Sequence, residues 1–139
     1  MRIAISVFAC LVAVGCGGDG GSPTGPTNNA PVPFNQSSSA TVSTFGTTYQ
    51  PLNIPRSGTM TITLSWGTNA DLDLYLTPAS CQGANLYAPR DCQILAKSDR
   101  ASGSSETITR SVNTGETFAV WVDNFAGSPQ NYTITLNIQ

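Results

Sequence analysis

Residues 59–76, TMTITLSWGTNADLDLYL, constrain the fold of this chain more than any other segment. Their first half alternates apolar residues with Thr and Ser, and their second half alternates Leu with Asp and Tyr. Alternation with a period of two is typical of a strand that buries one face. Gly67 and Asn69, between the halves, have turn chemistry. The segment therefore predicts two strands, 59–66 and 71–77, paired as an antiparallel hairpin with a wet outer face.

Six further segments carry strand signals, and none shows the three- and four-residue apolar spacing of a helix. The expected strands are 40–45, 49–54, 94–98, 106–112, 117–122 and 132–138. Pro51 lies inside the second of them, which indicates an edge position because proline cannot donate to a sheet. About eight short strands separated by turns predict an all-β protein, an antiparallel β-sandwich or jelly roll.

Several stretches of the chain also resemble a known family, the bacterial pre-peptidase C-terminal (PPC) domain. The resemblance rests on GTMTITLSW, ADLDLYL, ILAKS, SSETITRSVNTGETFAVWV and NYTITLNIQ, and it covers roughly residues 49–139. It implies a β-sandwich of the kind appended to secreted peptidases and other hydrolases, where the domain is linked to secretion, maturation or substrate attachment. Relative to that family's usual pattern, the loop around residues 81–92 is an insertion.

The N-terminus is typical of a bacterial lipoprotein signal peptide, residues 1–15. Arg2 precedes an apolar run too short for a bilayer, which needs about 20 residues, and the run ends at Gly15 and Cys16. We expect cleavage before a lipidated Cys16; the alternative is ordinary cleavage without lipid. The Gly-, Pro-, Ser-, Thr- and Asn-rich residues 16–39 predict a flexible tether. The expected location is the cell envelope, lipid-anchored, with 40–139 as the folded domain.

Two cysteines remain once Cys10 is removed with the signal peptide and Cys16 carries lipid. These are Cys81 and Cys92, with ten residues between them. An even number of cysteines in an exported chain predicts one disulfide. The alternative, a pair of metal-binding thiolates, needs further Cys or His, and the chain has no His.

Charge and composition exclude several function classes. Removing Arg2 leaves five basic against eight acidic residues, a net charge of −3, without a basic stripe, so nucleic acid is not an expected partner. Without His there is no Ser-His or Cys-His arrangement, and the Gly-rich phosphate and HExxH motifs are also absent. We therefore expect no enzyme and no cofactor.

Two aspartates, Asp71 and Asp73, project from the same face of the predicted strand 71–77. Carboxylate oxygens are ligands that calcium prefers, so the pair is a candidate calcium site. The alternative is that these side chains cap the turn or pair with Arg100 or Arg110. Two ligands fall short of the six to eight that calcium takes, which favours the alternative.

Aromatic side chains predicted to point outward give the remaining functional hypothesis. If the leucines of 71–77 face the core, Tyr75 faces outward, and the same alternation in 117–122 turns Trp121 outward. With Asp123 and Asn124 they form the candidate ligand-binding residues, suited to a peptide or a glycan. The alternative is that a loop such as 81–92 covers Trp121.

These observations predict a non-catalytic envelope lipoprotein whose β-sandwich binds a protein, peptide or glycan. Two alternatives stay open: a purely structural envelope module, and an accessory domain for a separately encoded hydrolase.

Overall fold

The computed structural model describes residues 32–67, 70–81 and 92–139. Within them the chain forms eight strands and one 3-10 helix, and no helix there is long and apolar enough to cross a membrane. The elements are β1 (Phe34–Val42), β2 (Thr47–Asn53), β3 (Gly58–Trp66), β4 (Leu72–Pro78), η1 (Ala79–Cys81), β5 (Ala96–Ser98), β6 (Ser105–Val112), β7 (Thr117–Asn124) and β8 (Gln130–Ile138). The predicted all-β sandwich is confirmed.

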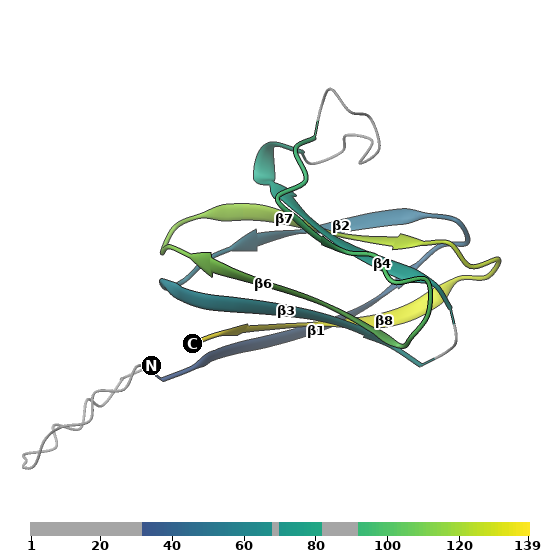
Figure 1. Cartoon of the computed structure of the whole chain (residues 1–139), viewed down its shortest axis with the longest axis horizontal. Coiled ribbons are helices and arrows are strands. Elements are labelled where there is room, and N and C mark those ends of the chain that lie inside the picture. Colours follow the sequence, from purple (N-terminus) through teal and green to yellow (C-terminus); the bar gives the residue numbers. More distant parts are fainter. Residues whose placement is uncertain (1–31, 68–69, 82–91) are drawn as a thin grey trace, which may run out of the picture. The chain divides into compact units, whose positions relative to one another are not determined.

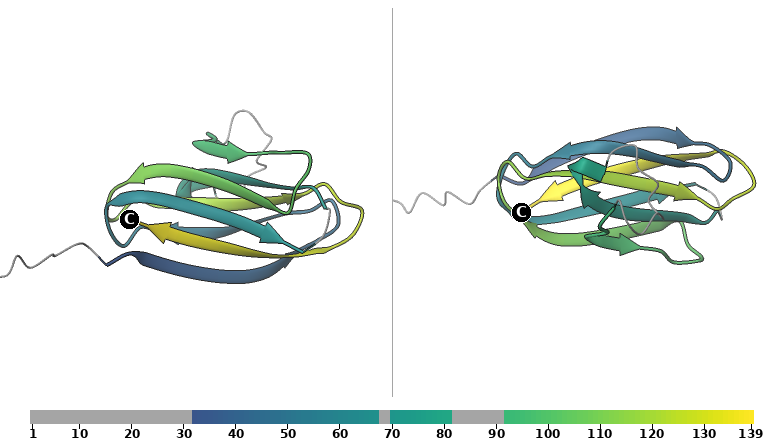
Figure 2. Two further views of the ribbon diagram at one scale, coloured as in Figure 1. Left: turned by 60° about the horizontal axis from the view of Figure 1, so that its bottom comes forward. Right: turned by 90° about the horizontal axis from the view of Figure 1, so that it is seen from above.

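The strands make two four-stranded sheets that face each other (Figure 1). One sheet has the order β1-β8-β3-β6 and the other the order β2-β7-β4-β5, and every pairing is antiparallel. The two layers can be followed from two further directions in Figure 2. Strand β2 lies at a sheet edge, as Pro51 indicated, because a residue without an N–H is tolerated there.

The predicted hairpin between residues 59–66 and 71–77 is wrong. Strand β3 pairs with β6 and β8, whereas β4 pairs with β5 and β7 in the opposite sheet. The chain between Trp66 and Leu72 therefore crosses from one sheet to the other. Alternation specifies which side chains are buried but not which strand is the neighbour, and both strands bury their apolar residues in the same core.

The core fills the space between the two sheets. Six strands, β1, β3, β4, β6, β7 and β8, contribute buried members, and the expected inward residues of β3 and β4 are all among them. Met60, Ile62, Leu64, Leu72, Leu74 and Leu76 are each fully buried. Burial of one such side chain stabilises the fold by about 1.5–3 kcal/mol. The apolar residues that alternate inward on both sheets therefore account for the packing of one sheet against the other.

Strand β1 begins at Phe34, earlier than the domain start expected at residue 40, so residues 34–39 belong to the sheet and not to a tether. Its register places Phe34 opposite Ile138 and Val42 opposite Gln130. We call the end with Phe34 and the C-terminus the base. The other end, with the turn 43–46 and the loop 125–129, we call the apex. Base and apex are about 26 Å apart along β1, at about 3.3 Å per residue.

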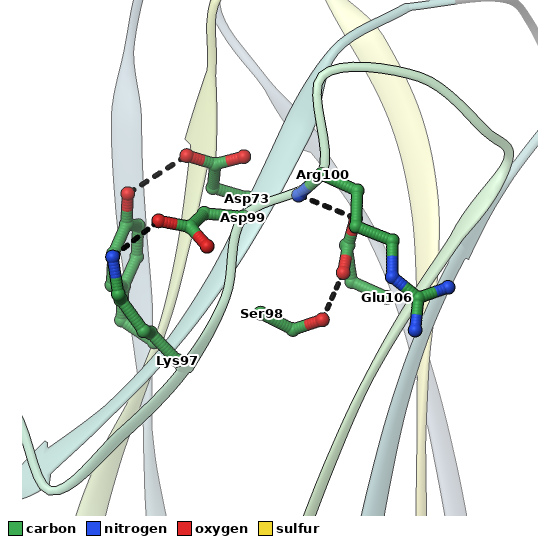
Figure 3. Close-up of polar contacts among 7 residues, drawn as sticks. Asp73, Lys97, Ser98, Asp99, Arg100 and Glu106 are labelled. Carbon is green, nitrogen blue, oxygen red and sulfur yellow. Dashed lines mark hydrogen bonds and ion pairs between the residues drawn. The ribbon is translucent and has the colours of Figure 1, made fainter.

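Polar contacts close the two lateral sides of the sandwich. On the β5–β6 side, Glu106 points inward and is 1% exposed; it accepts hydrogen bonds from the Ser98 hydroxyl and, at 3.0 Å, from the Arg100 backbone N–H (Figure 3). On the β1–β2 side, Ser38 donates to Gln50 at 3.0 Å. A groove of about 220 Å³ opens there over the core residues Ile62 and Val120. Polar residues at these sides match the known tendency of edge strands to avoid apolar exposure.

Candidate functional site

Tyr75 and Trp121 lie on the outer face of the β2-β7-β4-β5 sheet, away from the main core. They are register partners on adjacent strands, and Tyr49 is the partner of Trp121 on its other side. The Tyr49 and Trp121 ring centroids are 4.8 Å apart at an interplanar angle of 39°. The three rings thus form one row across β2, β7 and β4. The sequence left open whether the two candidate rings share a sheet face, and the register places them on one.

The exposure predicted for these two rings is wrong. Tyr75 is 5% exposed and Trp121 is 4% exposed, and together with Ala119 they form a second, smaller apolar cluster. The indole Nε1–H of Trp121 donates to the Thr77 hydroxyl at 2.9 Å, so its polar atom is satisfied inside the protein. Alternation gives the direction of a side chain but not what covers it. Buried rings offer no platform for stacking on a ligand.

The outer face next to this cluster carries aspartates that are also buried rather than wet. Asp73, labelled in Figure 3, is 7% exposed and accepts a hydrogen bond from the Tyr75 hydroxyl at 2.8 Å. Burial raises the pKa of Asp73 to about 6, the Tyr75 bond lowers it, and the nearby Asp71, Asp99 and Asp123 raise it further. Asp123 is 5% exposed and accepts from the Thr47 hydroxyl at 2.9 Å.

A calcium site on Asp71 and Asp73 gains no support from this arrangement. In the described segments, no three Asp, Glu, Cys or His side chains converge as ligands for a metal ion. The hydroxyl of Tyr75 occupies one oxygen of Asp73. Lys97, which Figure 3 labels together with Asp73 and Asp99, pairs with Asp99 at 2.5 Å. The pair Asp71 and Asp73 therefore supplies two carboxylates where calcium takes six to eight oxygens.

Asn124, the fourth candidate ligand residue, is 1% exposed and organises the apex instead of facing solvent. Its side-chain amide donates to the backbone oxygens of Ser43 at 2.9 Å and Ser128 at 3.0 Å. Its Oδ1 accepts from the Ala126 backbone N–H at 2.8 Å. One buried amide thus ties the turn 43–46 to the loop 125–129. This role depends on loops far apart in the sequence, so no local pattern predicted it.

The apex presents two phenylalanines that are not among the four candidate ligand-binding residues, although Phe125 directly follows Asn124. Phe45 is 72% exposed and Phe125 is 46% exposed. Phe45 was expected to end the first strand, but it lies in the turn 43–46, after β1. The signal that was available in the sequence is Gly46 directly after it, since glycine is typical of turns.

The two cysteines of the folded domain lie next to each other. The Sγ of Cys92 is 3.7 Å from the backbone oxygen of Cys81, at the end of η1. This proximity is compatible with the predicted disulfide, which stays a prediction. Residues 82–91 between them, and residues 1–31 with the predicted signal peptide, Cys16 and most of the predicted tether, lie outside the described residues.

The outer face of the β1-β8-β3-β6 sheet is built from one chemical class of side chain. Each of its four strands contributes four outward residues, and all are Ser, Thr or Asn. We call this the hydroxyl face: Asn35, Ser37, Ser39, Thr41, Thr59, Thr61, Thr63, Ser65, Ser105, Thr107, Thr109, Ser111, Asn131, Thr133, Thr135 and Asn137. Neighbours bond across strands, as in Ser39 with Thr133 at 2.9 Å. Near the apex the face has a shallow hollow of about 560 Å³.

No model of a protein family and no curated protein matches the chain. Its fold is similar to that of a mitogen from Yersinia pseudotuberculosis (16% identity, TM-score 0.55, 78% of this chain and 88% of that one). It is also similar to PliG of Aeromonas hydrophila, a periplasmic inhibitor of g-type lysozyme (12%, 0.50, 76% and 86%). A third similar structure is the pre-peptidase C-terminal domain of a Bacillus anthracis collagenase (13%, 0.51, 72% and 88%). At these identities the likeness establishes a shared β-sandwich fold.

Proposed function

We propose that this chain is a non-catalytic lipoprotein of the bacterial cell envelope, held by a lipid on Cys16 and binding a ligand outside the cytoplasm. The observation that carries the proposal is where the chain enters the sandwich. The first strand begins at Phe34, opposite Ile138, at the base and away from the apex. The similar folds include a lysozyme inhibitor and a domain of a collagenase, which fits a role in binding.

The lipid anchor is tested by replacing Cys16 with Ser in the full-length chain expressed in a bacterial host. We expect the wild-type protein to fractionate with membranes and the Cys16→Ser protein to be soluble, because a thiol is needed to accept the lipid. Mass spectrometry of the membrane fraction should detect a diacylglyceryl mass on Cys16. Cys10→Ser is the matched control and should leave the fractionation unchanged. An unmodified N-terminus at another residue would contradict the anchor.

The hydroxyl face favours a neutral glycan as the ligand class. Ser and Thr hydroxyls both donate and accept hydrogen bonds, which suits the hydroxyl groups of a sugar. Along each strand these side chains recur about every 6.6 Å, and adjacent strands are about 4.8 Å apart. The face carries no charged side chain, so a neutral polymer meets no unpaired charge on it. The hollow near the apex lies among Ser39, Ser65 and Thr133 and offers a place for one or more sugar rings.

The glycan hypothesis is tested with the double variant Thr63→Val and Thr133→Val, because Val keeps the shape of Thr and removes its hydroxyl. We expect binding to soluble dextran, xylan or mannan. The double variant should lose affinity about thirtyfold, because two hydrogen bonds are lost at about 1 kcal/mol each. Thr117→Val, exposed on the other sheet, is the control and should bind as the wild type does. Equal binding by the double variant and by Thr117→Val would exclude the hydroxyl face as the glycan-binding surface. Absence of binding to all three polymers would favour the structural or hydrolase-accessory alternative.

A further inference from the structure

Two exposed aromatic side chains lie on adjoining segments at the apex. Phe45 lies in the turn 43–46 and Phe125 lies in the loop 125–129. The two segments are joined by a hydrogen bond from the Phe45 N–H to the Ala126 oxygen, 3.3 Å long. The Phe45 ring lies over Gly127, where an added β-carbon would sit 3.8 Å from Cζ. Single exposed apolar residues are ordinary on a protein surface, but two on adjoining loops make a patch.

The backbone at Phe45 argues that this ring is not there for stability. Its φ is 46°, and it is the single non-glycine residue with positive φ among those that the structure describes. The turn closes with a 3.0 Å bond from the Gly46 N–H to the Ser43 oxygen, so Phe45 is its third residue, where positive φ favours Gly or Asn. A bulky side chain is disfavoured in this conformation. Both the positive φ and the exposure to solvent therefore disfavour a phenylalanine at position 45. The stability of the fold alone does not explain why this residue is there.

Buried hydrogen bonds hold the apex in one arrangement. Besides the three bonds of the Asn124 side chain, the Asn124 N–H donates to the Gly46 oxygen at 2.9 Å and the Phe125 N–H donates to the Asp71 oxygen at 3.0 Å. Three segments distant in the sequence are thus fixed together around one amide. A surface ordered before binding loses less conformational entropy when a partner arrives.

The charges next to the apex are negative. Asp71 is half-buried beside the apex, and Asp73 and Asp123 follow on β4 and β7, where they are 7% and 5% exposed. Asp71, Asp99 and Asp123 each lie close enough to Asp73 to raise its pKa. Lys97, which is close enough to Asp73 to interact with it electrostatically, is paired with Asp99. The electrostatic field of these carboxylates at the apex disfavours anionic lipid and favours a positively charged partner.

We propose that the apex is a docking surface for a basic protein that has an apolar pocket for Phe45, with Phe125 packing beside it. This rests on the proposed function, because it requires the domain to be displayed outside the cytoplasm with the apex free. Asn124 is a positioning residue: it holds both loops and does not touch the partner. The partner is named by chemistry, a cationic surface around an apolar cavity.

The partner is identified by photo-cross-linking in cells that carry the full-length lipoprotein. p-Benzoylphenylalanine replaces Phe45 or Phe125 and, as the control, Ile94, which is 40% exposed near the base. We expect one discrete protein adduct from both apical positions, none from position 94, and a partner with an isoelectric point above about 9. An adduct shared by all three positions, an acidic partner, or no adduct would overturn the proposal.

The affinity of the purified partner for this protein then distinguishes a direct contact at the apex from a coincidental cross-link. Phe45→Asn suits the positive φ and removes the ring; we expect affinity to fall about tenfold or more, as at an interface hot spot. Ile94→Asn should change it less than about twofold, and the thermal midpoint of Phe45→Asn should equal or exceed that of the wild type. Raising the salt concentration should weaken wild-type binding.

Vesicles of phosphatidylethanolamine and phosphatidylglycerol test the other class of target. Wild-type binding to them that Phe45→Asn abolishes would assign the apex to lipid and overturn the protein partner. Membrane fractionation of Cys16→Ser reports on the anchor independently. If the apex binds no such partner while the Cys16 anchor is confirmed, this inference is refuted and the proposed function stands.

Discussion

Trp121→Ala is expected to lower the free energy of unfolding by about 3–5 kcal/mol, the cost typical of removing a buried aromatic side chain. The ring is 4% exposed, stacks with Tyr49 and donates to Thr77, so the truncation removes packing and leaves a buried hydroxyl without its donor. For a domain of this size each kcal/mol shifts the melting temperature by about 4–8 °C. Urea unfolding followed by circular dichroism measures the change.

Two companion variants show which part of the Trp121 environment matters. Trp121→Phe keeps a ring but loses the indole N–H, and we expect a cost of about 1–3 kcal/mol from the lost hydrogen bond to the Thr77 hydroxyl and the smaller volume. Tyr49→Ala removes a ring that is 39% exposed and should cost clearly less than Trp121→Ala. A cost below about 1 kcal/mol for Trp121→Ala would mean that the outer-face cluster is not packed as described.

The stability of the protein is expected to fall as the pH rises from 4 to 6, because of Asp73. Its pKa is about 6 in the folded state against 3.8 for an ordinary Asp, so the folded state holds a proton that the unfolded state has released. Unfolding in this window therefore releases protons, and stability declines with pH. The full difference corresponds to at most about 3 kcal/mol, at 1.36 kcal/mol per pH unit.

Asp73→Asn removes this titration and keeps an oxygen that accepts from Tyr75. The variant should match the wild type near pH 4 and exceed its stability at pH 7. Urea unfolding at pH 4, 5, 6 and 7 measures both slopes. Glu116→Gln, in the turn before β7, is the control and should keep the wild-type slope. Identical slopes in the wild type and Asp73→Asn would show that Asp73 is not desolvated.

The positions of the strands could be read from the sequence to a large extent. Residues with period-two alternation, such as those of β3 and β4, became strands with the expected faces inward. The residues at the start of β1, Phe34 to Ser39, were not predicted to be a strand because they are nearly all polar and exposed. Strand structure there depends on pairing with β8. A sheet edge can recruit such a segment through backbone hydrogen bonds without any apolar signal.

For the candidate site, the sequence predicted which way the side chains point from their strands but not whether they are exposed to solvent. Alternation correctly turned Tyr75 and Trp121 away from the main core, and it correctly turned the Ser and Thr residues of β3 outward. Whether an outward side chain meets water depends on what lies above it, which is a property of neighbouring strands and loops. Phe45 and Phe125 are the converse case, since two ordinary loop residues became a patch because Asn124 joins their loops.

The sequence by itself determined the class of structure, through local rules that act within one strand: alternation for buried faces, proline for an edge, and glycine for turns. Only the tertiary structure decided the pairing of β3 with β6 and β8, the burial of Trp121 and Asp73, and the meeting of the apical loops. Each of these depends on contacts between residues far apart in the chain. No periodicity within a segment records such contacts, because they arise when the two sheets pack and cover each other.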